Sequence, residues 1–504
     1  MNLSSRAAPA KSLDLPIEAP DLIAVIVMAL FAFAEGVALT QSDGDLFAHV
    51  RLGQIILGAD TIPATSVLGF SFDATAVYPA WLAAVWFASL HRAGGLALIV
   101  ATTAVVAGIA HGAVSLLFRR RGLEFKSNIL ASLLAVALAA SHWLARPHEF
   151  TLLFTAVLLV LLETPGIWVA IACGCMFLLW ANLHGGWAFG LVLLSCYVAG
   201  DALELLANND RPAWRSRLTR DALALSFSAL ATFCTPYGFR LHQAVLSTLS
   251  DRSVATLINE YQPPGLSALP DILFFGVLAL SILAILGSRR RPSFPALLAI
   301  VVTTIFAFRA SRNIALFGLV GWPLIALHLL SRPDTATSGS DTVREMGSDT
   351  KLARVGLIAG MFACLVLLLG AVHGTVAGRR FIADSVDSER FPVVAVSRLR
   401  AAGNQANTLT TWVWSGYVPF AWPGKRVFFD PLLFSPAILD RFGDMLLTRP
   451  GWHQQLEKSN VGTVLLPRGV PLADSLAMDI GWTQWHRDGT AVVFLRRNPA
   501  VAIQ

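Results

Sequence analysis

The chain has 504 residues, of which 55% are hydrophobic and only 14% are charged, and its mean hydropathy is +0.63. Soluble domains carry about 25% charged residues, so the composition excludes an ordinary soluble protein and predicts an α-helical polytopic membrane protein. The net charge of +6 at pH 7 does not indicate a nucleic-acid partner, because the arginines stand between apolar runs, where arginine sets membrane topology.

The chain opens with a polar tail, a hydrophobic segment and a long loop. Residues 1–20 are polar and contain three prolines, which predicts a short cytoplasmic tail. Residues 21–40 supply the roughly 20 apolar residues that a bilayer span requires. In the loop at 41–93, the stretches 46–57 and 79–90 are apolar but too short to span, so both are expected to lie as helices in the membrane interface.

Arginines and lysines sort the later loops into two sets. Further apolar runs bring the total to about eleven expected spans, and alternate loops are rich in arginine, for example those at 119–121 and 289–291. Because positively charged loops face the cytoplasm, the N-terminus is expected inside and the loop at 41–93 outside. The additional expected spans are 94–117, 127–144, 150–163, 166–181, 185–206, 221–235, 271–287, 293–308, 313–331 and 353–372.

The composition changes after about residue 375. Helical patterns near 436–448 and 469–480 are interleaved with stretches of β-branched and aromatic residues, which predicts a small α/β domain. An odd number of spans puts this domain in the periplasm. The expected strands lie at 408–414, 425–429, 462–466 and 490–495. The expected domains are a tail at 1–20, a transmembrane domain at 21–375 and a periplasmic domain at 376–504.

The expected outer loops share one property, which is that ionisable residues lie close to the ends of the spans. Such residues are costly at a membrane unless they have a partner or a function, and arginine on the outer side runs against the charge bias. The loops are therefore expected to converge on one site. Its candidate residues are Asp43, Asp45, His49, Arg146, His148, Glu149, Asn182, His184, Tyr237, Glu260, Gln262, Arg309 and Arg312.

The chemistry of these side chains indicates a phosphate-bearing substrate. Arginine binds two phosphate oxygens with its planar fork and keeps its charge, and a nearby carboxylate can take the proton of an attacking hydroxyl. Asp45 and His49 share one helix face. This spacing fits a shared metal ion, a base with the residue that orients it, or a helix cap beside a surface histidine. Asp43 is preferred as the base, because Asp45 also fits the N-cap.

Structural roles compete with these functional ones. The triplet Asp43-Gly44-Asp45 is typical of turns and helix caps, and His184 beside two glycines fits a packed turn. Tyr237 follows a proline and also fits a turn, and arginines at positions 309 and 312 fit side chains that reach from a span to the interface. Function is favoured because these separate explanations would all have to coincide on one side of the membrane.

With these residues in view, the chain resembles the GT-C superfamily of membrane glycosyltransferases, especially its bacterial members. The resemblance covers most of the chain. The motifs that carry it are Asp43-x-Asp45-x-x-x-His49, Arg146-Pro147, Trp180-Ala181-Asn182-Leu183-His184-Gly185-Gly186, Pro236-Tyr237-Gly238, Glu260-x-Gln262-Pro263, Gly416-Tyr417 and Val427-Phe428-Phe429-Asp430. The chain departs from relatives that have an aromatic residue such as Trp before the histidine, since it has Phe47-Ala48 there.

The resemblance implies a bundle whose first external loop carries an essential acidic residue. It implies inverting transfer of a sugar from a polyprenyl-phosphate donor, with Asp43 or Asp45 as the base and arginines such as Arg309 or Arg312 on the donor phosphate. Some relatives need a divalent ion, so Mg²⁺ or Mn²⁺ is left open as a cofactor, with Asp45 and His49 as candidate ligands.

The leading hypothesis is therefore a hexosyl or pentosyl transferase of the bacterial inner membrane. Its partners would be the lipid bilayer, the polyprenyl-phosphate-linked sugar, and a glycan, lipid or protein acceptor. An O-antigen-type polymerase or ligase would also use external arginine and histidine, but it gives the acidic pair in the first loop no role. A transporter or flippase would predict internal repeats and charges near the bilayer midplane, which the sequence does not show.

Overall fold

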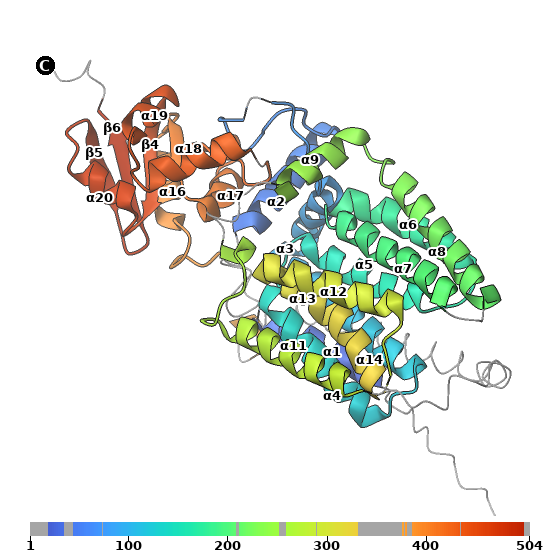
Figure 1. Cartoon of the computed structure of the whole chain (residues 1–504). Coiled ribbons are helices and arrows are strands. Elements are labelled where there is room, and N and C mark those ends of the chain that lie inside the picture. Colours follow the sequence, from blue (N-terminus) through green and yellow to red (C-terminus); the bar gives the residue numbers. More distant parts are fainter. Residues whose placement is uncertain are drawn as a thin grey trace, which may run out of the picture.

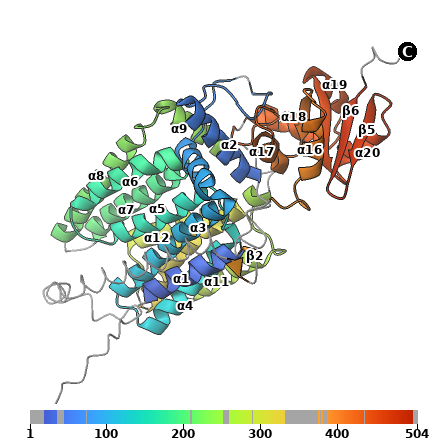
Figure 2. The ribbon, with the colours of Figure 1, turned by 180° about the vertical axis from the view of Figure 1, so that it is seen from behind.

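The computed structural model describes residues 19–34, 44–72, 74–207, 211–250, 259–288, 290–330, 375–376, 379–380, 386–433 and 435–497. A bundle of apolar helices forms one part of the molecule, and a smaller α/β domain lies at one end of it (Figure 1). Helix α2, Gly44–Ala59, lies between these two parts in both views (Figures 1 and 2).

The bundle contains the apolar helices of the expected transmembrane domain. Within the described ranges, four helices are long and apolar enough to cross a membrane, and five shorter apolar helices accompany them. The count of about eleven spans stays a prediction, and the span expected at 353–372 lies outside the described residues. These nine helices are α1 Ala19–Ala34, α3 Trp81–Arg120, α4 Phe125–Ala139, α5 His148–Leu162, α6 Trp168–Leu183, α7 Trp187–Ala207, α11 Leu269–Gly287, α12 Phe294–Arg309 and the stretch Ser311–Leu330, which ends in α14 Trp322–Leu330. Helix α8, Arg211–Ala231, has a charged first half and packs against α6 and α7.

Short elements close the ends of these helices. The π-helix η6, Phe317–Gly321, continues from α13, Ile314–Leu316, into α14. Near the α/β domain lie η3 Ala140–His142, α9 Phe239–Ser250, η4 Asn259–Tyr261 and η5 Ser311–Asn313. Buried aromatic side chains, among them Phe177, Trp180 and Phe274, fill the core of the bundle.

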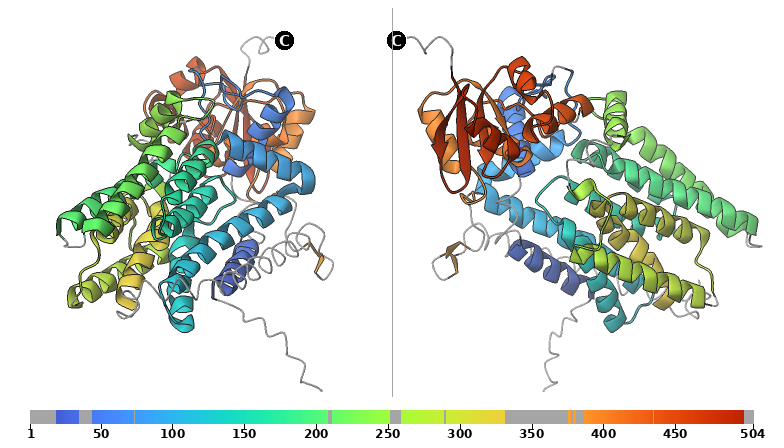
Figure 3. Two further views of the ribbon diagram at one scale, coloured as in Figure 1. Left: turned by 90° about the vertical axis from the view of Figure 1, so that its right-hand side faces the viewer. Right: turned by 60° about the vertical axis from the view of Figure 1, so that its left-hand side comes forward.

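Helix α3 joins the second expected interface helix to the span that follows it. The two parts meet at Gly94 and Gly95, where the backbone leaves helical geometry and Gly95 has φ +67°. Glycine tolerates this conformation because it has no Cβ. The break therefore lets the interface part, beginning at Trp81, and the long apolar part take different directions (Figure 3).

The α/β domain is built on a four-stranded mixed sheet in the order β3-β4-β6-β5. The parallel pair β3, Asn407–Thr410, and β4, Val461–Pro467, is followed by two antiparallel pairings through β6, Ala491–Arg496, to β5, Trp482–Arg487. Helices pack around this sheet. They are α16 Val393–Ala401, α17 Trp412–Ala421, α18 Pro436–Leu446, α19 Trp452–Lys458 and α20 Pro471–Ala477. A separate hairpin pairs β1, Thr375–Val376, with β2, Arg379–Arg380.

Two expected strands of this domain differ in the structure. The strand expected at 408–414 ends at Thr410, and Trp412 begins helix α17. The stretch expected at 425–429 forms only isolated bridges, in which Val427 pairs with Thr408 and with Gly69 of the loop between α2 and α3. Strand β5 was not expected.

The loop between α2 and α3 is tied to the α/β domain. Phe70 N–H donates to the Val427 carbonyl at 2.9 Å, and Val427 N–H donates to the Leu68 carbonyl at 2.9 Å. The buried Asp430 carboxylate accepts hydrogen bonds from the Ser66 hydroxyl at 2.8 Å and the Tyr78 hydroxyl at 3.3 Å. The loop thus adds an extra strand segment to the domain and carries Tyr78 back to the bundle.

Candidate active site

Asp45 lies in the first turn of α2 and faces Arg146 from the other side of the site. Its Oδ2 is 3.2 Å from Arg146 Nη1. The helix begins at Gly44, so Asp45 lies inside the first turn and not at the N-cap position. A carboxylate in a first helical turn is stabilised by the helix dipole. The sequence favoured Asp43 as the base because Asp45 fitted the N-cap of the helix. In the structure Asp45 instead contacts an arginine, and Asp43 lies outside the described residues.

Glu260 is the central anion of the site. Its Oε1 is 3.0 Å from Arg312 Nη1 and 3.6 Å from Arg146 Nη1, and its Oε2 is 3.9 Å from His142 Nδ1. The backbone holds this arrangement, because Ser311 N–H donates to the Gln262 carbonyl at 2.8 Å and so ties η4 to η5. Two arginines therefore share one carboxylate between them.

The four charged side chains of this cluster are partly open to a ligand. Those of Asp45, Arg146, Glu260 and Arg312 are between 19% and 24% exposed. The guanidinium of Arg312 also lies 4.5 Å from the centre of the Tyr261 ring, a distance typical of a cation–π contact. The cluster combines fixed charges with partial access, which is what recognition of an anionic group requires.

Neutral histidines surround these charges. Burial lowers the pKa of His49 to about 3, with smaller contributions from the charges of His184 and Arg146. Burial and then Arg312 lower the pKa of His184 to about 3. Burial, followed by Arg312 and Arg146, also holds the pKa of His142 well below its ordinary value. All three imidazoles are therefore neutral at physiological pH and add no cation to the site.

The neutral histidines predict a loss of stability in acid. Their folded-state pKa values lie below that of unfolded histidine, about 6.5, so the unfolded chain binds more protons and stability falls as the pH drops from about 6.5 towards 3. His49→Gln should flatten this fall in melting curves of detergent-purified protein between pH 7 and 4.5. An unchanged pH slope in the variant would show that His49 titrates normally.

His184 is fixed by the two glycines that follow it. Gly186 N–H donates to His184 Nδ1 at 3.1 Å, and Thr151 Oγ1 lies 2.7 Å from the same nitrogen. Because Nδ1 accepts the Gly186 hydrogen bond, the neutral ring carries its proton on Nε2. A Cβ at residue 186 would lie 2.1 Å from Thr151 Oγ1, so only glycine fits there. The motif therefore sets both the position and the tautomer of the histidine.

Asn182 and Tyr237 bind groups at and just before the start of α3. Asn182 Oδ1 accepts a hydrogen bond from Trp81 Nε1 at 3.0 Å, and its amide donates to the Cys234 carbonyl at 3.1 Å. The Tyr237 hydroxyl accepts the Tyr78 N–H at 3.2 Å. These two expected site residues hold the start of α3 against the bundle.

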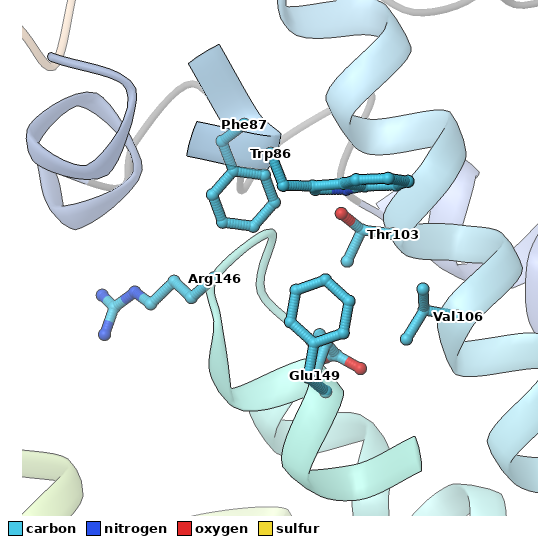
Figure 4. Close-up of a pocket in the computed structure, with 7 residues that line it drawn as sticks. Trp86, Phe87, Thr103, Val106, Arg146 and Glu149 are labelled. Carbon is cyan, nitrogen blue, oxygen red and sulfur yellow. The ribbon is translucent and has the colours of Figure 1, made fainter. Parts of the chain in front are cut away.

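The remaining candidates lie behind or beside the charged cluster. His148 and Glu149 are buried, and His148 Nε2 donates to the His142 carbonyl at 2.7 Å. Glu149 and Arg146 line a small, mainly apolar pocket with Trp86 and Phe87, and the guanidinium of Arg146 points away from Thr103 and Val106 on its far side (Figure 4). The side chains of Gln262 and Arg309 are exposed.

The expected metal ligands do not form a cation site in the described residues. Asp45 faces Arg146, and His49 Nδ1 is buried with no hydrogen-bond partner. No three His, Cys, Asp or Glu side chains are close enough together to hold a metal ion in the ranges that the structure describes.

Sequence reasoning did not single out several residues that the structure places in or next to this site. His142 and Tyr261 contact the charged cluster directly, and Tyr78 binds the candidate residue Tyr237 through its backbone N–H. His142 lies near the end of the span expected at 127–144, four residues before Arg146, so the available signal was an ionisable residue close to the end of a span.

No protein-family model and no curated protein sequence matches the chain. Solved structures do match. The archaeal oligosaccharyltransferase AglB from Archaeoglobus fulgidus, in complex with an inhibitory peptide and a dolichol-phosphate, aligns with a TM-score of 0.53 at 12% identity over 96% of this chain and 74% of that chain. The same enzyme tethered with an acceptor peptide gives 0.52 at 13% identity over the same shares.

ArnT from Cupriavidus metallidurans bound to undecaprenyl phosphate covers 96% of this chain and 99% of its own, at 14% identity and a TM-score of 0.47. The AglB matches carry the conclusion. The chain has the GT-C fold. At these identities the likeness concerns the fold alone, and it confirms at that level the resemblance seen in the motifs. In this chain the charged cluster lies at one end of the apolar helical bundle.

Proposed function

We propose that this GT-C protein is a glycosyltransferase of the bacterial inner membrane that uses a polyprenyl-phosphate-linked sugar. The observation that carries the proposal is the cluster of Asp45, Arg146, Glu260 and Arg312, which brings two arginines and two carboxylates together at one end of an apolar bundle. The match in fold to AglB, whose structure contains a dolichol-phosphate, supports the same donor class.

The geometry fits direct displacement at the anomeric carbon. The Asp45 carboxylate takes the proton of an acceptor hydroxyl, whose oxygen bonds to the anomeric carbon of the donor. The bond between that carbon and the phosphate oxygen breaks, and its electron pair leaves with the polyprenyl phosphate. Arg146 and Arg312 stabilise the charge that develops on the phosphate. A single displacement inverts the anomeric configuration.

The proposed site faces the periplasm. The arginine-rich loops of the sequence, including Arg119 to Arg121, lie at the opposite ends of the helices from Asp45 by the alternation of spans. The donor would therefore be used on the outer side of the membrane, and the α/β domain would lie there as well. Accessibility of cysteines introduced at the exposed positions Leu57 and Lys126 to a membrane-impermeant reagent measures this orientation.

Release of the lipid phosphate tests the proposed reaction. Membranes that contain the protein are supplied with a panel of polyprenyl-phosphate sugars, and both free polyprenyl phosphate and glycosylated product are measured. We expect both to form in equal amounts, and neither to form in membranes without the protein. Movement of an intact lipid-linked sugar without cleavage would instead identify a flippase, and consumption of lipid-diphosphate glycans alone would identify a polymerase or ligase.

A further inference from the structure

Helix α2 is held between the α/β domain and α3 by unusually close backbone contacts. A Cβ on Gly416 of α17 would lie 2.0 Å from the Gly44 carbonyl oxygen, and a Cβ on Gly44 would lie 1.8 Å from the Val413 carbonyl oxygen. Further along, a Cβ on Gly53 would lie 1.9 Å from the Ala84 carbonyl oxygen in α3. The contact of α2 with α17 and its contact with α3 therefore both depend on glycine.

The contact at Gly416 lies directly beside the proposed base. Gly44 is the first residue of α2 and Asp45 follows it, so the carbonyl that faces Gly416 belongs to the peptide unit preceding the Asp45 side chain. Backbone atoms cannot rotate out of the way as the end of a side chain can. Any group larger than hydrogen at residue 416 must therefore move the first turn of α2 or the helix α17.

Aromatic packing prevents α2 from moving independently. The Phe47 ring lies 5.1 Å from Phe391, 5.5 Å from Tyr417 and 5.0 Å from Phe420, measured between ring centroids. All four side chains belong to one buried cluster or pack against it. Aromatic pairs at these distances have preferred geometries. The α/β domain therefore holds the beginning of α2 from two sides.

We infer that Gly416 is a positioning residue, through which the α/β domain fixes the Asp45 carboxylate opposite Arg146. The inference rests on the proposed function, in which Asp45 is the base. It assigns the α/β domain a part in the site although no side chain of α17 is needed in the chemistry. Asp45 and Arg146 lie 3.2 Å apart only while α2 and α17 remain in contact.

The contact between α2 and α17 also explains why Ala48, and not an aromatic residue, precedes His49 in this chain. A Cβ on Gly416 would also lie 3.0 Å from the Ala48 Cβ, so α17 already occupies the space beside residue 48. A tryptophan before His49 would overlap α17, and this chain instead places its aromatic residue one position earlier, at Phe47. The small residues at 44, 48 and 416 therefore form one matched set.

The test is Gly416→Ala, with Gly58→Ala on α2 and Gly489→Ala in the α/β domain as controls, because a Cβ at either control position meets nothing within 4 Å. We expect Gly416→Ala to lower kcat at least tenfold while the KM for the donor changes less than threefold. In the Asp45→Asn background the same substitution should cost less than threefold, because its effect is exerted through Asp45. An equal loss in both backgrounds would overturn the inference.

A structure of Gly416→Ala separates this inference from the proposed reaction. If wild-type protein transfers no sugar, the proposed function fails, but the position of Asp45 relative to Arg146 can still be measured. A distance that remains 3.2 Å in the variant would overturn the positioning role. Should Gly416→Ala not fold, Ala48→Val enlarges the facing side chain by two methyl groups and is assayed in the same two backgrounds, with the same expected results.

Discussion

Asp45→Asn is expected to lower the turnover of sugar transfer by about 10²–10⁴-fold, the range that a positioned general base contributes. The substitution keeps the shape of the side chain but removes the proton acceptor, and it also removes the charge that faces Arg146 at 3.2 Å. Because the donor contacts through Arg146 and Arg312 remain, the KM for the donor should change much less than kcat. Initial rates of polyprenyl phosphate release measure both quantities.

Asp60→Asn is the matched control for this substitution, because Asp60 is an exposed carboxylate just past the end of the same helix. It should leave turnover within twofold of wild type. Asp43→Asn is measured alongside, since Asp43 is the other carboxylate that the sequence proposes. Full activity in Asp45→Asn together with a large loss in Asp43→Asn would transfer the role of base to Asp43, and full activity in both would exclude a carboxylate base in the first loop.

Arg312→Ala is expected to reduce kcat/KM for the donor by about 10²–10³-fold, comparable to the removal of one preorganised donor from a charge-stabilising site. Arg312 binds Glu260 at 3.0 Å and lies over the Tyr261 ring at 4.5 Å, so its guanidinium is held in place before the donor arrives. Its removal also leaves Glu260 with less compensation for its charge.

Arg309→Ala provides the comparison, because Arg309 lies three residues earlier at the end of α12 with an exposed side chain. The sequence alone treats both arginines alike. We expect Arg309→Ala to change kcat/KM less than threefold, and equal losses in the two variants would contradict the assignment of the phosphate contact to Arg312.

Local patterns in the sequence were sufficient for several elements of the fold. The interface helix expected at 46–57 is α2, and the apolar run expected at 271–287 closely matches α11. The stretch at 412–421 shows why other elements were missed. Its Trp, Val and Tyr residues favour strand by propensity, but packing of Gly416 against Gly44 favours the helix α17. That contact joins residues far apart in the sequence, so no local pattern contains it.

The candidate site was predicted as a set of residues but not as a set of contacts. Sorting the loops by charge placed Asp45, Arg146, Glu260 and Arg312 on one side, and the structure brings these four together. The same argument grouped Asn182 with them, although its side chain holds Trp81. An amide can serve a ligand or a neighbouring loop equally well, and only the tertiary structure distinguishes the two uses.

The carboxylate of Glu260 between two arginines has a consequence for how the donor is recognised. The described cluster contains two positive and two negative side chains, and the surrounding histidines are neutral, so its formal charge is zero before the donor arrives. An incoming phosphate that takes the place of the Glu260 carboxylate beside the arginines gains only the difference between the two interaction energies. Under the proposed function, small free anions such as sulfate should therefore compete poorly with the polyprenyl-phosphate donor.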